Sequence, residues 1–73
     1  MANITSIMRL KNRLKYWRHM NQMEQKEFAE FLGVARQQYN RWERQVVQPN
    51  IETAWALAKK LNTKMDDLFE EQE

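Results

Sequence analysis

Four side chains that can read the edges of DNA bases lie within six consecutive positions of this chain. All carry hydrogen-bonding groups, and they are Arg36, Gln37, Asn40 and Arg41. An arginine can bind O6 and N7 of guanine with two hydrogen bonds, and a glutamine or asparagine can do the same with N6 and N7 of adenine. Each such pair is worth roughly 1–3 kcal/mol of discrimination between bases. On a helix, the spacing places all four on one polar face, which is the chemistry of a surface that reads the major groove.

The apolar residues around this segment predict the elements that must position it. Ala29 is small where two helices would cross closely, and Gly33 follows four positions later, where a left-handed turn is needed. Tyr39 and Trp42 lie three residues apart and give the second helix one buried stripe, opposite the polar face. Two short helices joined by a tight turn form a helix-turn-helix, which favours sequence-specific binding to double-stranded DNA.

The remaining pattern predicts an all-α fold of five short helices, in one domain that spans residues 1–73. The expected helices cover residues 6–20, 24–32, 35–44, 51–61 and 65–70, with residues 1–6 and 71–73 frayed. The first helix rests on apolar residues at steps of three, four and three, namely Ile7, Leu10, Leu14 and Trp17. We expect no β-strand.

The last two helices are defined by the residues that separate and anchor them. Pro49 blocks continuation of the third helix, and Asn50 is a suitable N-cap for the fourth. The apolar stripe expected in the fourth helix consists of Ile51, Ala54, Ala58 and Leu61. The fifth helix is expected to dock onto the core through Met65, Leu68 and Phe69.

Composition argues against several other classes of protein. A chain of 73 residues can bury one small core, and with no cysteine it has neither disulfides nor thiolate metal ligands. His19 is the only histidine and Ser6 the only serine, so we expect no metal site, no Ser-His-Asp catalysis and no cofactor. The apolar runs are too short to cross a membrane, and the N-terminus lacks the apolar run of a signal peptide, which favours a cytoplasmic protein.

Charge is distributed unevenly along the chain. Residues 65–73 contain five acidic and no basic side chains, whereas residues 1–64 contain twelve basic and five acidic ones. No acidic residue occurs among residues 1–18. A basic body with an acidic tail is typical of a protein that binds the phosphate backbone, but a solvated helix face followed by a solubilising tail would show the same pattern.

Over residues 10–69 the chain resembles the helix-turn-helix domain of phage lambda repressor and Cro-type regulators, the XRE family. The residues that carry the resemblance keep the register of that family: Leu14, Trp17-Arg18, Met23, Gln25, Phe28-Ala29, Leu32-Gly33-Val34, Trp42-Glu43, Pro49, Glu52-Thr53, Leu57-Ala58, Leu61 and Asp66 to Phe69. Each pair is weak evidence alone, and their common register makes the match specific. The resemblance implies a compact, five-helix, lambda repressor-like fold and a transcriptional regulator of bacterial or phage type.

The resemblance also implies roles for single residues. Base contacts fall on the four residues of the polar face. The family's phosphate-contacting positions fall on Gln25, Ala35, Arg44, Gln45 and Gln48, the last two through the backbone of their loop. Gln25 could in addition brace a side chain of the recognition helix, and Arg44 could equally be a simple solvated charge. Arg18 and Glu43 match an ion pair that links the first helix to the end of the third.

The chain departs from the family at several helix ends. Glu24, Ala35 and Lys64 stand where a Ser or Thr cap is usual, and an alanine at such a position costs about 1 kcal/mol. Gln45 stands where the family prefers glycine, so we expect this turn to bend differently. A carboxylate at residue 24 would repel a nearby phosphate unless an arginine or lysine neutralises it.

One tryptophan suggests a second interface. Trp55 follows Ala54, which already serves the buried stripe of its helix, so we expect Trp55 to be partly exposed. With Leu68 and Phe69 it would suit the interface of a homodimer, although a tryptophan folded over the last helix remains equally open. Two-fold dimers are common in the family and place their recognition helices about 34 Å apart on a pseudo-palindromic operator.

The leading hypothesis is therefore a sequence-specific regulator, acting as a repressor on double-stranded DNA. Two alternatives remain open. An antitoxin or restriction–modification controller would use the same domain, with a protein partner still to be identified. A protein-interaction module could have kept the fold and lost DNA binding, although such a module need not keep four base-reading side chains.

Overall fold

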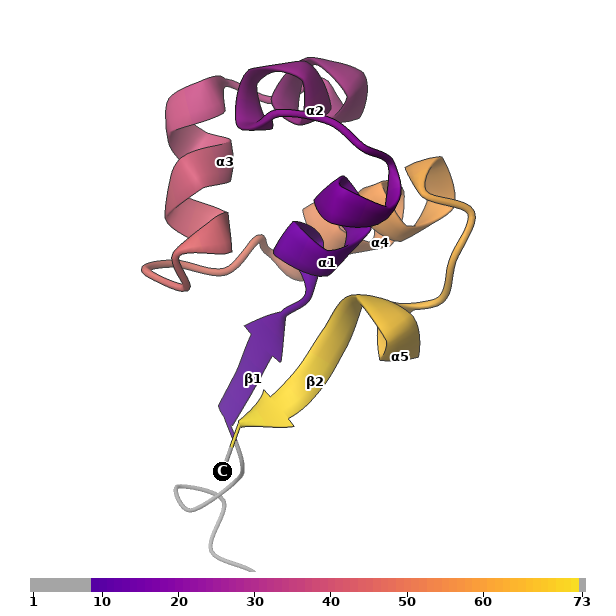
Figure 1. Cartoon of the computed structure of the whole chain (residues 1–73). Helices are drawn as coiled ribbons and strands as arrows, with labels where there is room; N and C mark the ends of the chain where they lie inside the picture. Colours follow the sequence, from indigo (N-terminus) through magenta and orange to yellow (C-terminus); the bar gives the residue numbers. More distant parts are fainter. Residues whose placement is uncertain (1–8, 73) are drawn as a thin grey trace, which may run out of the picture.

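The computed structural model describes residues 9–72, which form five helices and one two-stranded antiparallel sheet (Figure 1). In chain order the elements are β1 (Arg9–Asn12), α1 (Leu14–Met20), α2 (Gln25–Leu32), α3 (Arg36–Glu43), α4 (Ile51–Lys60), α5 (Met65–Leu68) and β2 (Phe69–Gln72). All five predicted helices are present, and a short turn joins α2 to α3. The expected frayed segment 1–6 and the last residue lie outside the described residues.

Four of these helices end with one residue in the left-handed backbone conformation. These residues follow α1, α2, α3 and α4, and they are Gln22, Gly33, Gln45 and Asn62, with φ of 56°, 80°, 64° and 56°. After α3, the N–H of Val46 donates to the carbonyl of Arg41 at 3.0 Å, which is the hydrogen bond of a Schellman motif. The left-handed turn predicted at Gly33 is confirmed, and glycine adopts it without the steric cost that a Cβ adds.

The core takes apolar side chains from every helix. Its buried members are Leu14, Phe28, Ala29, Leu32, Tyr39, Trp42, Ala54, Leu57, Ala58 and Leu68. Phe28 and Tyr39 pack edge to face with ring centroids 5.6 Å apart, which joins α2 to α3. The prediction for Ile51 was wrong, because this first residue of α4 lies outside the core and is 75% exposed.

The sheet is the main departure from the predicted fold. We expected one helix over residues 6–20, but residues 9–12 form β1, in which Asn12 lies opposite Phe69 of β2. The apolar spacing supported a helix locally, whereas the partner strand lies far along the chain and leaves no sign in the neighbouring residues. Leu10 is accordingly 51% exposed, and Ile7 lies outside the described residues.

Asn12 marks the boundary between strand and helix. Its Oδ1 accepts a hydrogen bond from the N–H of Leu14 at 3.1 Å, and this type of bond starts a turn instead of continuing a regular element. At the other end of the chain, α5 stops at Leu68 and not at residue 70, because Phe69 begins β2 directly. Glu71 and Gln72, which we expected to be frayed, belong to this strand. The sheet therefore joins the two ends of the described chain.

Candidate nucleic-acid interface

The four predicted base-reading residues lie together on the surface of α3. Arg36, Gln37 and Arg41 are exposed, and Asn40 is half-buried. With Gln25 from the start of α2, they line one shallow depression between the two helices. The opposite face of α3 is buried in the core, as the two aromatic residues of its apolar stripe predicted. The helix thus exposes a continuous polar surface with hydrogen-bond donors and acceptors. Its buried face restricts rotation of the helix about its own axis.

The side chains on the polar face of α3, namely Arg36, Gln37, Asn40 and Arg41, are called the recognition surface below. Gln25 connects α2 to this surface. Its Oε1 accepts a hydrogen bond from Nδ2 of Asn40 at 3.2 Å, and its Nε2 donates to Oε1 of Glu43 at 3.0 Å. The expected brace of a recognition-helix side chain is therefore present. Each end of the Gln25 amide makes one hydrogen bond within the protein, which leaves the second N–H of Nε2 without a partner among residues 9–72.

The ion pair between α1 and the end of α3 has bidentate geometry. Nε and Nη2 of Arg18 donate to the two carboxylate oxygens of Glu43 at 2.9 and 3.0 Å. The two side chains are only 13% and 7% exposed, so water screens their attraction weakly. Arg18 also donates to the carbonyl of Met23 at 3.2 Å, which ties the α1–α2 turn to the same pair.

Tyr39 adds a contact that sequence reasoning missed. Its hydroxyl donates to Oε2 of Glu43, one turn further along α3. Burial of the Tyr39 hydroxyl raises its pKa far above the ordinary value, and the hydrogen bond to the carboxylate raises it further. The spacing of four residues on one helix was the available signal, but we assigned Tyr39 to the apolar stripe alone.

The charge of Glu43 is stabilised by its neighbours. Burial alone would raise the pKa of this carboxyl, but hydrogen bonds from Arg18, Tyr39 and Gln25 hold the pKa below its usual value. The same carboxylate raises the pKa of the Arg18 guanidinium through their hydrogen bond. A buried, fully bonded carboxylate therefore connects α1, α2 and α3 at the base of the recognition surface.

The loop between α3 and α4 holds three of the predicted phosphate contacts. Arg44 is exposed at its start. We expected the turn at Gln45 to bend differently from the family's glycine turn, and this prediction was wrong. Gln45 takes the left-handed conformation of the glycine that it replaces, with φ of 64°. The side chains of Gln45 and Gln48 bond to Asn12 of β1 and to one another. Their side-chain amides are thus bonded within the protein.

Of the three unusual helix starts, only the one at Glu24 is capped locally, whereas Ala35 and Lys64 make no side-chain capping bond within residues 9–72. The N–H of Glu24 donates to Oε1 of Glu27 at 2.9 Å, so the first turn of α2 supplies its own acceptor. Ala35 precedes α3 in an extended conformation, and among the described residues its side chain makes no capping hydrogen bond. Ala35 is exposed, and a phosphate at the N-terminus of α3 would be favoured by the helix dipole and the free N–H groups.

Part of the basic N-terminal run pairs with the acidic C-terminal segment. Nζ of Lys11 lies 3.5 Å from Oε2 of Glu70 across the sheet, and Nη1 of Arg13 donates to the carbonyl of Asp67 at 3.2 Å. The guanidinium of Arg13 also lies over the ring of Tyr16, 4.4 Å from its centroid. The uneven charge of the sequence is therefore partly internal, and it supports DNA binding less directly than the surface of α3 does.

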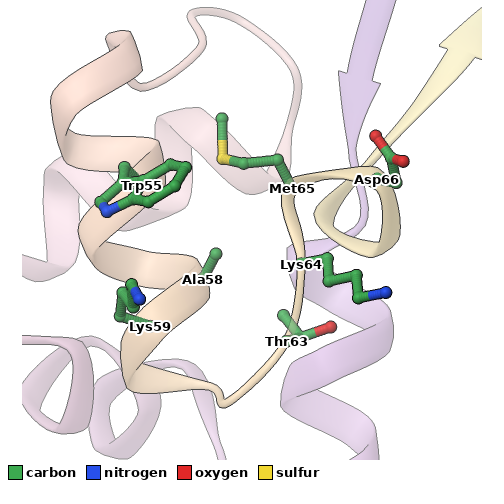
Figure 2. A pocket seen from close by; sticks show the side chains of 7 residues that line it. All are labelled: Trp55, Ala58, Lys59, Thr63, Lys64, Met65 and Asp66. Atoms are coloured by element: carbon green, nitrogen blue, oxygen red, sulfur yellow. The ribbon is translucent and has the colours of Figure 1, made fainter.

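An apolar surface lies on another part of the molecule. Trp55 is 59% exposed, as we expected. Figure 2 shows Trp55 of α4 and Met65 of α5 on opposite sides of a groove, with Lys59 and Lys64 nearby. The groove has a volume of about 360 Å³. Phe69 is half-buried. The prediction that Leu68 belongs to this surface was wrong, because Leu68 is completely buried in the core.

No helix among residues 9–72 has the length and apolar character needed to span a membrane.

Residues 14–68 match the sequence profile of a helix-turn-helix family, which covers α1 to α5 and thus the whole recognition surface. A curated relative from Methanocaldococcus jannaschii, an uncharacterized HTH-type transcriptional regulator, is 35% identical over 60 residues, which cover 82% of this chain and 91% of the relative. Together with the arrangement of α2 and α3, these matches show that this chain belongs to the XRE, or lambda repressor/Cro-like, family of helix-turn-helix DNA-binding transcriptional regulators.

Proposed function

We propose that this regulator recognises a specific duplex operator by inserting α3 into the major groove. The observation that carries the proposal is the gathering of all four base-reading side chains, with Gln25, along one depression on the exposed side of α3. Arg36, Gln37 and Arg41 are free to extend toward base edges. Asn40 is held by Gln25 through one N–H, which leaves its Oδ1 and its second N–H for a base.

Contacts to the phosphate backbone would fix the register of α3 in the groove. Gln25 begins α2, Ala35 is the N-cap of α3, and the exposed Arg44 follows the end of α3. Within residues 9–72, the backbone N–H groups of Val47 and Gln48 have no hydrogen-bond partner, so these donors are available to a phosphate oxygen. Phosphate contacts carry no sequence information, so specificity rests on α3.

In vitro selection from a random duplex library at near-physiological salt tests this function. We expect enrichment of one motif by the wild-type chain. Arg36→Ala and Arg41→Ala should each relax the preference for one base pair and weaken binding to that motif by roughly 5–150-fold, since a bidentate contact is worth about 1–3 kcal/mol. Lys60→Ala removes the same charge from an exposed position on α4 and is the matched control. No enrichment, with a control regulator enriching normally, would reject DNA reading and favour a protein-interaction module.

We further propose that a second copy of this chain covers the apolar surface around Trp55. This surface runs from Ile51 and Trp55 on α4 to Met65 on α5, and a neighbouring groove continues from Met65 to Leu10 and Phe69 at the sheet. Large exposed apolar side chains in one region are costly in water and favour association. Lys59, Lys64 and Asp66 line this groove and Glu52 lies beside Trp55, so side chains of both charges border the surface and can pair across a two-fold axis.

The dimer is tested by sedimentation of the wild-type chain and of Trp55→Glu. We expect the wild-type chain to sediment as a dimer at micromolar concentration and the variant as a folded monomer. Tyr16→Glu places the same charge at an exposed aromatic residue on α1 and should stay dimeric. A dimer would enrich a pseudo-palindrome whose half-sites lie about one DNA turn apart. If the wild-type chain sediments as a monomer, the dimer proposal is rejected, and recognition of a single DNA site remains possible.

We assign the regulator a repressive role, because occupancy of an operator that overlaps a promoter needs only tight binding. A reporter gene under a promoter that carries the selected motif tests this assignment. Repression should appear with the wild-type chain and disappear with Arg41→Ala. Activation of the same reporter would reverse the assignment.

A further inference from the structure

Three amide side chains tie the α3–α4 loop to β1. Asn12 is the buried polar residue at the centre, and it is 4% exposed. Its Nδ2 donates to the carbonyl of Trp42 at 2.7 Å and to Oε1 of Gln48 at 2.8 Å. Trp42 lies in the last turn of α3, where carbonyl groups lack partners within the helix. Asn12 thus bonds the end of the recognition helix and the following loop at once.

Gln45 completes the connection. Its Oε1 accepts from the backbone N–H of Asn12 and its Nε2 donates to the backbone carbonyl of Asn12, both at 3.0 Å. The amide of Gln45 therefore pairs with one residue of β1 in the way that a neighbouring strand would. Nε2 of Gln48 donates to the same Oε1 at 2.7 Å, so each of the three residues is bonded to both of the others. We name Asn12, Gln45 and Gln48 the amide clamp.

Gln45 combines a left-handed backbone with a side chain that bonds to a distant element. A residue with φ of 64° would ordinarily be glycine, because a Cβ is strained in this conformation. A glycine would keep the Schellman turn and lose the two hydrogen bonds that the Gln45 side chain makes to the backbone of Asn12. In this chain the strained residue instead carries the side chain that reaches β1 and fixes the loop.

We propose that the amide clamp is a set of positioning residues for DNA binding. It holds the α3–α4 loop so that the N–H groups of Val47 and Gln48 meet a phosphate without further ordering. A loop that is ordered in advance loses less conformational freedom on binding and therefore binds more tightly. The β1–β2 sheet, which lies outside the helix-turn-helix, becomes a support of the DNA interface. The inference rests on the proposed function, because it needs a duplex that the chain binds.

Gln45→Gly separates the clamp from the turn, because glycine accepts the left-handed backbone. Gln22→Gly is the matched control. Gln22 has φ of 56° at the corresponding position after α1, and its side chain makes no hydrogen bond within the described residues. Affinity for the selected duplex is measured at several salt concentrations, with thermal unfolding alongside. We expect Gln45→Gly to bind about tenfold more weakly at every salt concentration, while Gln22→Gly binds like the wild type.

The salt dependence separates positioning from charge. A backbone N–H releases no counterion from DNA, so Gln45→Gly should leave the slope of log affinity against log salt unchanged. Arg44→Ala, if this side chain meets a phosphate, should lower that slope by about 1. Gln48→Ala should weaken binding in the same way as Gln45→Gly. The double variant should lose less than the product of the two single losses, since both break one network.

Three results would overturn the inference. If Gln45→Gly binds as tightly as the wild type, the clamp has no part in binding and the proposed function stands. If the affinity of Gln45→Gly falls only in proportion to a loss of folded protein, the clamp is a determinant of stability alone. If the wild-type chain enriches no duplex at all, the proposed function fails and the positioning role fails with it.

Discussion

Arg18 and Glu43 lie 25 positions apart in the sequence and form a bidentate ion pair between α1 and the last residue of α3. The same carboxylate also accepts from Gln25 of α2 and from Tyr39 of its own helix. A single acidic group therefore bonds three helices at the base of the recognition surface. These bonds attach the C-terminal end of α3 to both α1 and α2.

Loss of the Glu43 carboxylate should destabilise the fold. Glu43→Ala removes the acceptor of three side chains and leaves the guanidinium of Arg18 largely buried without its partner. We expect a loss of about 3 kcal/mol, because breaking a buried pair from one side leaves an uncompensated charge. Urea unfolding followed by circular dichroism measures the change. Glu30→Ala, at an exposed position on α2, is the matched control. Equal midpoints for both variants would show that the pair contributes nothing.

The same group should make stability depend on pH in acid. The pKa of Glu43 is lower in the folded protein than its usual value, because hydrogen bonds and the Arg18 charge outweigh burial. Folding therefore favours the carboxylate, and this stabilisation is complete above the unfolded pKa of about 4.3 and is lost as pH falls through the lower folded value. Thermal unfolding between pH 2 and 7 should show a fall in melting temperature below about pH 4. The fall should be shallower in Glu43→Gln, and equal slopes would contradict the assignment.

Tyr39→Phe isolates the hydroxyl from the aromatic ring. The variant keeps the edge-to-face packing on Phe28 and removes the donor to Glu43. We expect a loss of about 1.5–3 kcal/mol, since hydrogen bonds to charged groups exceed the usual 1 kcal/mol. Denaturant titration of Tyr39→Phe beside Tyr16→Phe, an exposed tyrosine, gives the comparison. If Tyr16→Phe loses more stability than Tyr39→Phe, the buried hydroxyl of Tyr39 does not stabilise the fold as proposed.

Leu68→Ala tests whether the end of the chain belongs to the core. Leu68 is completely buried between the helices, and its carbonyl accepts from the N–H of Arg13 at 2.7 Å. The truncation should cost about 2–5 kcal/mol through lost burial and the cavity that remains. Met20→Ala, at a 62% exposed position on α1, should change stability by less than about 0.5 kcal/mol. A loss in Leu68→Ala no greater than in Met20→Ala would place Leu68 outside the cooperative core.

The helix-turn-helix was predictable because its signals are local. Gly33 needs the left-handed conformation that follows α2, and Tyr39 and Trp42 repeat at helical spacing, so the exposed face of α3 follows from the period of the helix. The four residues predicted to read bases could therefore be assigned to one surface before any fold was known. The pair Arg18–Glu43 was reached through the family register, since nothing local relates residues so far apart.

The sheet and the amide clamp could not be predicted in this way. Leu10 continued the helical spacing of the first segment, and only pairing with the strand after Leu68 makes residues 9–12 extended. Gln45 looked like an unfavourable replacement for glycine, because its benefit lies in Asn12, on an element distant in sequence. By itself, the sequence determined the helices, the turn and the polar face of α3, since these depend on propensities and periods within a few residues. Only the tertiary structure decided which strand pairs with which, which polar side chains are buried and what holds the loop beside α3, because those hydrogen bonds form between segments that folding alone brings together.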